Sequence, residues 1–296
     1  MARRKTEKVI FDTDIGSDID DAVALAWLLA NPACELVGIT TVSGQPEERA
    51  QLASALCRVA GKDVPIIPGA ANPLHVEARQ PVAQQAPSLE RWPHQERFED
   101  VEVTDFMADT IERNSGEITL LAVGPMTNVA NLFERYPESA GHLKQVVLMC
   151  GRFGDEQIGN RAGEWNVYCD PHAAQIVLNT PTRRMRAHGL DVTTKVRMHQ
   201  EEVHEYFRAP LLAPVMDMAE EWFSRRPLIT FHDPLAAVAV FNETLCTYER
   251  GYADVRLEHG DDQGMTAWTP SINGPLEIGV SVNADAFFDS YFGMFS

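Results

Sequence analysis

Cysteine is scarce in this sequence and follows no recognisable pattern. Only five of the 296 residues are cysteine, and no pair has CxxC or zinc-ligand spacing. This argues against a disulfide framework and against a structural zinc site. An odd number of cysteines in mostly apolar segments predicts reduced, buried thiols, at Cys34, Cys57, Cys150, Cys169 and Cys246.

Basic residues and long apolar runs are also few. Lys and Arg number 25 against 43 Asp and Glu, which gives a net charge of −18. We therefore expect no nucleic acid and no anionic membrane surface as a partner. No apolar run reaches the length of a membrane span. The start of the chain is basic but lacks the apolar stretch of a signal peptide, so a cytoplasmic location is expected.

Strand-like and helix-like segments alternate along the chain. Five apolar or β-branched runs predict strands, at 9–11, 35–41, 64–67, 117–123 and 145–149. Five further runs predict helices, at 22–30, 47–60, 103–114, 127–136 and 235–241. This alternation predicts an α/β fold with an open, mostly parallel central sheet flanked by helices. With 45% hydrophobic residues and no linker, residues 1–296 are expected to form a single domain.

One long segment, residues 70–100, breaks this alternation. It is rich in Pro, Gln, Arg and His and has no clear period. Long irregular segments in compact domains are often lids over sites, but a tolerated surface insertion explains this one equally well.

The first chemical motif is an acidic loop after the first strand, DTDIGSDIDD at residues 12–21. Its five carboxylates would repel one another unless a cation lies among them, and Mg²⁺ or Ca²⁺ are the natural candidates. A solvated turn is the plain alternative. An EF-hand is rejected because its sixth and twelfth positions hold Ser17 and Val23 instead of Gly and Glu. A metal-dependent phosphatase with Asp12 as nucleophile stays open, although Ile15 stands where that pattern expects Gly.

Two further clusters carry polar side chains at element ends. Glu164 and Asn166, with Asn160 upstream, suit a polyhydroxylated ligand if the segment is extended, but a capped turn explains them equally well. Asp233 opens an apolar helix, and on its own is best explained as its N-cap. His232 beside it offers a group that titrates near neutrality.

Together these motifs resemble the inosine–uridine nucleoside hydrolase family, the calcium-dependent N-ribohydrolases. The resemblance runs from Val9 to about Phe292 and rests on the shared order of several segments. They are DTDIGSDIDDA, with two residues more than the family's DxDxGxDDA, then LVGITTVSG, TLLAVGPMTNVA, VVLMCG, GEWNVYCDPHAA, GLDVT, FHDPLAAV and VNADAFF. The family implies a Rossmann-like nucleoside hydrolase fold. It also implies hydrolysis of the N-glycosidic bond of purine or pyrimidine ribonucleosides to free base and ribose.

The resemblance also implies roles for single residues. The implied cofactor is Ca²⁺, held by the carboxylates of Asp14, Asp21 and Asp233 and by the backbone carbonyl of Val123. Asp14 matches the general base, and His232 matches the histidine that helps the leaving base depart. The residues that match ribose contacts are Asp20, Asn160, Glu164, Asn166 and Met149. A homo-oligomer, dimer or tetramer, is implied as well.

The chain departs from the family pattern on the base side and at one contact to the sugar or the water. Gln45 and Pro46 follow TVSG where the family usually places Asn, and the family's HGxxGL stretch is not visible. Cys150 replaces the usual first Gly after Met149. These departures leave the base preference open. They also leave open a homologue that binds nucleosides or ribose without turnover.

Overall fold

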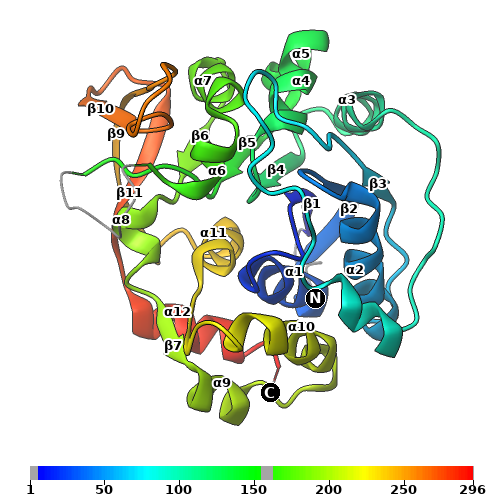
Figure 1. The fold of residues 1–296 in the computed structure, drawn as a ribbon. Coiled ribbons are helices and arrows are strands. Elements are labelled where there is room, and N and C mark those ends of the chain that lie inside the picture. The colour runs from blue at the N-terminus through cyan, green and yellow to red at the C-terminus, as the bar shows by residue number, and fades with distance from the viewer. Residues whose placement is uncertain (1–5, 155–162, 296) are drawn as a thin grey trace, which may run out of the picture.

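The structure, a computed structural model, describes residues 6–154 and 163–295. Within them a nine-stranded sheet runs in the order β10-β9-β11-β6-β5-β4-β1-β2-β3 (Figure 1). Its strands are β1 (Glu7–Thr13), β2 (Cys34–Thr41), β3 (Ile66–Pro68), β4 (Ile118–Ala122), β5 (Gln145–Leu148), β6 (Met185–Ala187), β9 (Cys246–Val255), β10 (Thr266–Pro270) and β11 (Leu276–Val282). A separate antiparallel pair joins β7 (Arg197–His199) to β8 (Leu228–Thr230).

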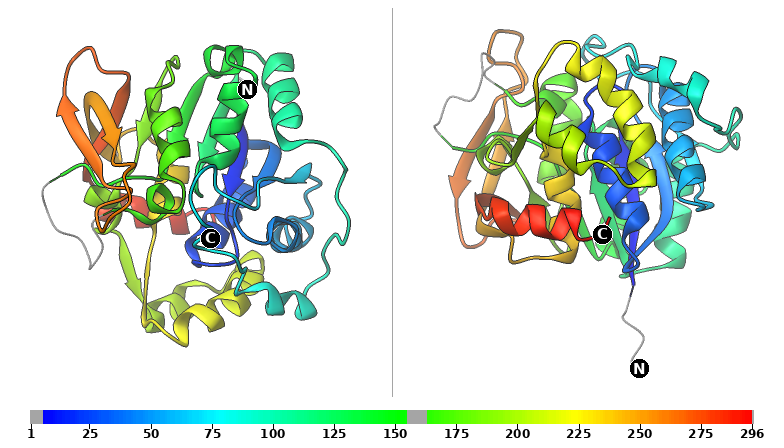
Figure 2. Two further views of the ribbon diagram at one scale, coloured as in Figure 1. Left: turned by 45° about the horizontal axis from the view of Figure 1, so that its top comes forward. Right: turned by 90° about the horizontal axis from the view of Figure 1, so that it is seen from below.

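The pairing in the large sheet is mostly parallel, which confirms the predicted fold class. β1 lies between β2 and β4 and runs parallel to both. The parallel set continues to β3 on one side and through β5 and β6 to β11 on the other. Only β9 pairs antiparallel, with β10 and β11, and with β10 it forms a hairpin at one edge of the molecule (Figure 2).

Helices cover the sheet and connect its strands. The α-helices are α1 (Asp20–Ala30), α2 (Pro46–Val59), α3 (Val103–Arg113), α4 (Thr127–Arg135), α5 (Glu138–His142), α6 (Trp165–Cys169), α7 (Pro171–Asn179), α8 (Leu190–Thr193), α9 (Gln200–Tyr206), α10 (Ala213–Phe223), α11 (His232–Phe241) and α12 (Ala284–Phe292). Two 3₁₀ helices are η1 (Ala86–Arg91) and η2 (Pro210–Leu212). No helix in the described ranges has the length and apolar character that a bilayer crossing needs.

The alternation of side chains along β1 explains why helices lie on both faces of the sheet. Val9 and Phe11 pack into one apolar core with α1, α2 and α11. Ile10, which points the other way, packs into a second core with α3, α4 and α7. A strand that is buried on both faces has a continuous apolar sequence, and residues 9–11 are such a run.

The topology fixes where a site can form. The strand order changes direction between β1 and β4, because the chain adds β2 and β3 on one side and β4 to β6 on the other. In open α/β sheets ligands bind beyond the carboxyl ends of the strands at such a switch point. Here that position holds the acidic loop after β1 and the backbone of Val123 after β4.

Candidate active site

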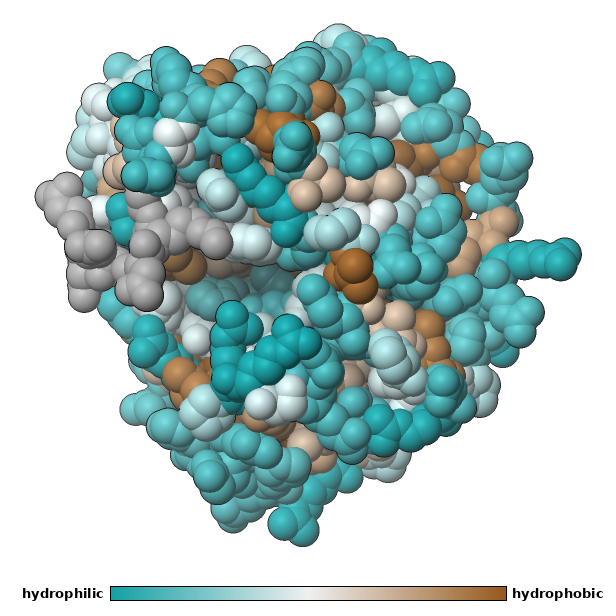
Figure 3. Space-filling model, in the orientation of Figure 1, coloured by the Kyte–Doolittle hydropathy of each residue, from teal (hydrophilic) through white to brown (hydrophobic). Residues whose placement is uncertain are grey.

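A cavity of about 730 Å³ opens at this switch point. A hollow near the centre of the face in Figure 3 is lined mainly by hydrophilic residues. The cavity brings together nearly all the residues that the sequence singled out, although they come from distant parts of the chain. Its lining includes Asp14, Asp20, Asp21, Val123, Met149, Glu164, Asn166, His232 and Asp233. Asn160 lies outside the described residues.

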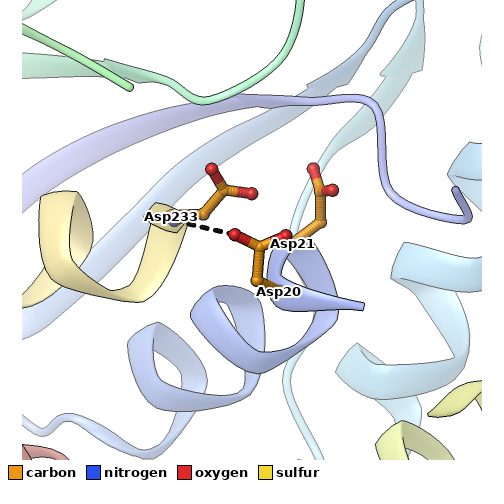
Figure 4. A group of neighbouring side chains, drawn as sticks. All are labelled: Asp20, Asp21 and Asp233. Carbon is orange, nitrogen blue, oxygen red and sulfur yellow. Dashed lines mark hydrogen bonds between the residues drawn. The ribbon is translucent and has the colours of Figure 1, made fainter. Parts of the chain in front are cut away.

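Three aspartates form a tight group where α1 and α11 begin. Asp20 and Asp21 lie in the first turn of α1, and Asp233 lies in the first turn of α11. One carboxylate oxygen from each lies within 4.8 Å of the others, and all three residues are buried (Figure 4). The N-cap interpretation of Asp233 was wrong: the N-cap is Phe231, whose side chain makes no capping hydrogen bond. The carboxylate of Asp233 instead lies beside those of the other two acids.

Asp14 belongs to the same cavity but not to that group of three. It lies in the loop that follows β1, and its Oδ2 atom accepts a hydrogen bond from Nε2 of Gln80. The fully buried Arg49 donates to the backbone carbonyls of Asp14 and Ile15, and so holds the loop. The loop also needs Gly16, whose φ of +113° is a conformation that side-chain-bearing residues rarely adopt.

The electrostatics of these acids fit a bound divalent cation. Burial raises the pKa of Asp14, Asp20, Asp21 and Asp233 above the usual range. For Asp20, Asp21 and Asp233 the next cause is repulsion from neighbouring carboxylates. A cation among them would offset both effects, and an all-oxygen donor set is what Ca²⁺ and Mg²⁺ prefer.

Val123 and Asn166 are joined directly. Nδ2 of Asn166 donates to the carbonyl of Val123 at 2.6 Å and to that of Met149 at 3.0 Å. A carbonyl oxygen has two lone pairs, so this bond leaves Val123 able to accept a second partner. The amide therefore ties the ends of β4 and β5 together at the cavity wall.

Glu164 shows that the capped-turn interpretation of its segment was correct. Its side chain caps α6, accepting from the backbone amides of Asn166 at 2.7 Å and Val167 at 3.0 Å. A third bond comes from the amide of Gly151 at 3.1 Å. The expectation of an extended segment was wrong, since Asn166 lies within the helix. Burial raises the pKa of Glu164 to about 7.

His232 lies at the start of α11 and lines the cavity. Its Nδ1 atom lies 2.7 Å from Oγ1 of Thr193. Burial, with a smaller effect of the Arg197 charge, lowers the pKa of His232 to about 4. Nδ1 of the imidazole is therefore already engaged by the protein.

Comparison with known proteins identifies the family. The model of the inosine-uridine preferring nucleoside hydrolase family matches residues 9–289 of this chain. The chain belongs to this family. It is accordingly a hydrolase that acts on N-glycosyl compounds, the ribonucleosides.

Relatives within the nucleoside hydrolase family span almost the whole chain. Uridine nucleosidase 1 of Arabidopsis thaliana is 29% identical over 90% of this chain and 85% of its own length. The pyrimidine-specific ribonucleoside hydrolase RihA of Citrobacter koseri is 31% identical, covering 87% of this chain and 86% of its own. A solved plant nucleoside hydrolase, PpNRh1, superposes with a TM-score of 0.83 at 25% identity over 98% of both chains.

A solved purine-preferring ribonucleoside hydrolase of Gardnerella vaginalis has a TM-score of 0.82 over 98% of both chains. At 23% identity this likeness shows the fold alone.

Two residues at the departures from the nucleoside hydrolase pattern, Gln45 and His75, do not line the cavity. Gln45 precedes α2, and its Oε1 atom accepts from the backbone amide of Ala83 at 3.0 Å. It is not among the described residues that line the cavity. His75 packs edge-on against His172, with ring centroids 4.9 Å apart, and is also absent from that lining.

Two cavity residues, Gln80 and Gln84, were not singled out in the sequence and come from the irregular segment 70–100. Trp222, Arg225 and Arg226, from α10 and the turn that follows it, line the same cavity. The irregular segment is therefore part of the site, and not a remote insertion. Its length was the only available signal, because a segment without a period gives no indication of which side chains point inward.

Proposed function

We propose that this protein catalyses the Ca²⁺-dependent hydrolysis of the N-glycosidic bond of ribonucleosides, with release of free base and ribose. The observation that carries the proposal is the buried trio of Asp20, Asp21 and Asp233, which shares one cavity with Asp14, Glu164 and Asn166. Such a cavity combines a cation site with hydroxyl-binding groups.

The residues that would hold the cation are Asp14, Asp21, Asp233 and the carbonyl of Val123. Asp21 and Asp233 lie close together in the trio, and Asp14 and Val123 line the same cavity. When bound, Ca²⁺ would bind vicinal ribose hydroxyls and favour ionisation of the attacking water. The same family resemblance that suggests Ca²⁺ also assigns Asp20 to the sugar, and its position in the trio keeps it within reach of either partner.

The side chains of the chain itself supply the remaining chemistry. Asp14 accepts the proton of the attacking water, as a general base. Asp20, Glu164 and Asn166, together with Asn160, bind the ribose hydroxyls, and Met149 packs beside the sugar. Cleavage places positive charge on the ribose ring, so buried carboxylates and amide oxygens around the ring stabilise the transition state. No second carboxylate is needed as a covalent nucleophile, because water displaces the base directly.

His232 acts on the leaving base in this proposal. Cleavage leaves negative charge on the base, and a hydrogen bond to it speeds departure. Because Thr193 engages Nδ1 of His232, Nε2 is the atom left for the base.

The deciding experiment incubates the purified protein with a panel of ribonucleosides and scores free base and free ribose. Uridine comes first because relatives that span most of this chain are named a uridine nucleosidase and a pyrimidine-specific hydrolase. Base release with Ca²⁺ that stops on chelation and returns on Ca²⁺ addition supports the proposal. Binding without base release favours a homologue that has lost turnover. Release that returns equally with Mg²⁺ alone contradicts the choice of Ca²⁺.

We further propose that residues 1–296 act as one domain within a cytoplasmic homo-oligomer, a dimer or tetramer. β1 and β11, from opposite ends of the chain, share one sheet, which supports a single domain. All five cysteines are buried and none forms a disulfide in the described part of the chain, which suits a reducing compartment. Sedimentation velocity measures the assembly directly.

A further inference from the structure

Gln80 occupies an unusual place for a residue of an irregular segment. Its side chain is buried, with 6% of the residue exposed, and it lines the cavity. Its amide makes two hydrogen bonds to other cavity residues. Nε1 of Trp165 donates to Oε1 at 2.5 Å, and Nε2 donates to Oδ2 of Asp14.

These two bonds determine which way the Gln80 amide faces. An indole N–H can only donate, so Trp165 requires the oxygen of the amide on its side. The NH₂ group must then face Asp14. Trp165 therefore sets the orientation of Gln80, and Gln80 presents a donor to Asp14 that favours the ionised carboxylate.

The other oxygen of Asp14 is directed elsewhere. A Cβ built on Gly124 would lie 2.7 Å from Oδ1 of Asp14, so this oxygen contacts the backbone beside Val123. One carboxylate oxygen thus faces Gln80 while the other faces the end of β4. The two oxygens of Asp14 have different surroundings, and only Oδ2 is committed to a side-chain donor among the described residues.

We propose that Gln80 is a positioning residue for Asp14, and that Trp165 acts through Gln80 by fixing its amide. The inference rests on the proposed function, in which Asp14 is the general base. The bond to Oδ2 prevents rotation of the carboxylate, so that Oδ1 stays directed at the reacting water. The irregular segment 70–100 thereby supplies a part of the catalytic geometry.

The backbone of Asp14 is held by a different group. Arg49 donates to the carbonyl of Asp14 and also to Ser43 O at 2.7 Å. Removing the Gln80 amide therefore leaves the loop anchored and releases the carboxylate of Asp14 and the indole N–H of Trp165 from their bonds to residue 80. For this reason Gln80→Leu should fold.

The test compares Gln80→Leu, Trp165→Phe and the double variant, with Gln145→Leu as a matched control. Gln145 is equally buried, with 6% exposed, but donates to Oγ1 of Thr119 at 3.1 Å away from the cavity. For Gln80→Leu we expect a fall in kcat of about 10- to 100-fold, typical of residues that orient a ligand or base, with KM changed by less than about threefold. Gln145→Leu should keep the wild-type kcat.

A double-mutant cycle tests whether Trp165 acts through Gln80. Trp165→Phe alone should lower kcat, but in the Gln80→Leu background it should cause no further fall, because both changes break one chain of bonds. A Trp165→Phe effect that is confined to KM, or that adds fully to that of Gln80→Leu, contradicts the role of Trp165.

A second readout does not depend on activity. Calorimetric titration of metal-stripped protein with Ca²⁺ should give a Kd about tenfold weaker in Gln80→Leu than in wild type or Gln145→Leu. If Gln80→Leu keeps both the wild-type kcat and the wild-type Kd, the inference is wrong. If wild-type protein releases no base from any ribonucleoside, the proposed function fails, and the Ca²⁺ titration still decides whether Gln80 positions Asp14.

If Gln80→Leu does not fold, the kcat and the Ca²⁺ Kd of Trp165→Phe decide whether the bond chain from Trp165 through Gln80 positions Asp14.

Discussion

The backbone amide of Asp233 donates a 3.1 Å hydrogen bond to Oδ2 of Asp20, a residue 213 positions earlier in the chain. The bond joins the first turns of α11 and α1 (Figure 4). The positive ends of both helix dipoles therefore meet at the acid trio, and they partly offset the repulsion among Asp20, Asp21 and Asp233. The two helix ends therefore help to hold the three carboxylates together in a buried position.

Replacement of Asp14 by Asn should abolish turnover. The substitution keeps the size of the side chain but removes both the negative charge for a cation and the base for the water proton. We expect kcat for uridine below about a tenth of the wild-type value, measured by base release with Ca²⁺ in excess. A variant that keeps a larger share of the rate would contradict both roles of Asp14. Unchanged circular dichroism and melting temperature would show that the loss is chemical.

The sugar should be recognised more strictly than the base. Asp20, Glu164 and Asn166 all offer partners to hydroxyls, and a buried site that loses such a partner keeps unpaired polar groups. A 2′-deoxyribonucleoside should therefore lose orders of magnitude in kcat/KM against its ribonucleoside counterpart, roughly 10³-fold or more. Competition between uridine and deoxyuridine in one reaction measures the ratio directly. Equal efficiencies would overturn the assignment of these residues to ribose.

Replacement of His232 by Ala should distinguish a leaving-group role from a packing role. A group that helps the base depart matters most for natural bases and little for an activated leaving group such as nitrophenol. We expect a large fall in kcat for uridine and a small one for nitrophenyl riboside. Equal losses on both substrates point to packing beneath α11. If neither substrate is affected, the leaving-group role moves to the irregular segment 70–100 or to the segment 222–226.

A buried histidine outside the cavity should make stability depend on pH. Burial, and secondarily the charge of Arg186, lowers the pKa of His188 from 6.5 to about 4. The unfolded chain therefore binds the proton more tightly than the folded protein does. As a result, burial of neutral His188 contributes to the free energy of unfolding above about pH 6.5, and this contribution is lost as the pH falls towards 4.

From pH 7.5 to pH 5 the loss from His188 should be about 2 kcal/mol, and His188→Gln should remove it. Urea unfolding of both proteins at the two pH values measures the difference. A pH dependence identical in the two proteins would show that His188 does not titrate on unfolding.

Much of the fold follows from local pattern. The predicted strand at 145–149 and the observed β5, Gln145–Leu148, nearly coincide, as do the predicted helix at 103–114 and α3, Val103–Arg113. Strands buried on both faces are continuous apolar runs, and helices with one buried face have a period near 3.6, so each carries its own signal. β9 and β10 were missed because a half-exposed strand such as Cys246–Val255 mixes charged and apolar residues.

The acidic motif and its neighbours indicate the chemistry from residue type and order alone. Their types, Asp, Glu, Asn and His, and their order along the chain are sufficient to resemble a family whose model matches residues 9–289. By itself, then, the sequence determined the fold class and the family, and it singled out many of the residues that line the cavity, because residue type and local spacing are written in it directly.

Only the tertiary structure decided how these residues meet. The N-cap interpretation of Asp233 failed because its local context cannot show Asp20, which lies far away in sequence and 3.1 Å from its amide. Gln80 had no signal at all, since an irregular segment has no period from which inward-facing positions can be inferred. Its orientation toward Asp14 exists because Trp165, 85 residues later, holds its amide oxygen. Hydrogen bonds between distant segments are decided by the packing of the whole chain, and local propensity contains no information about them.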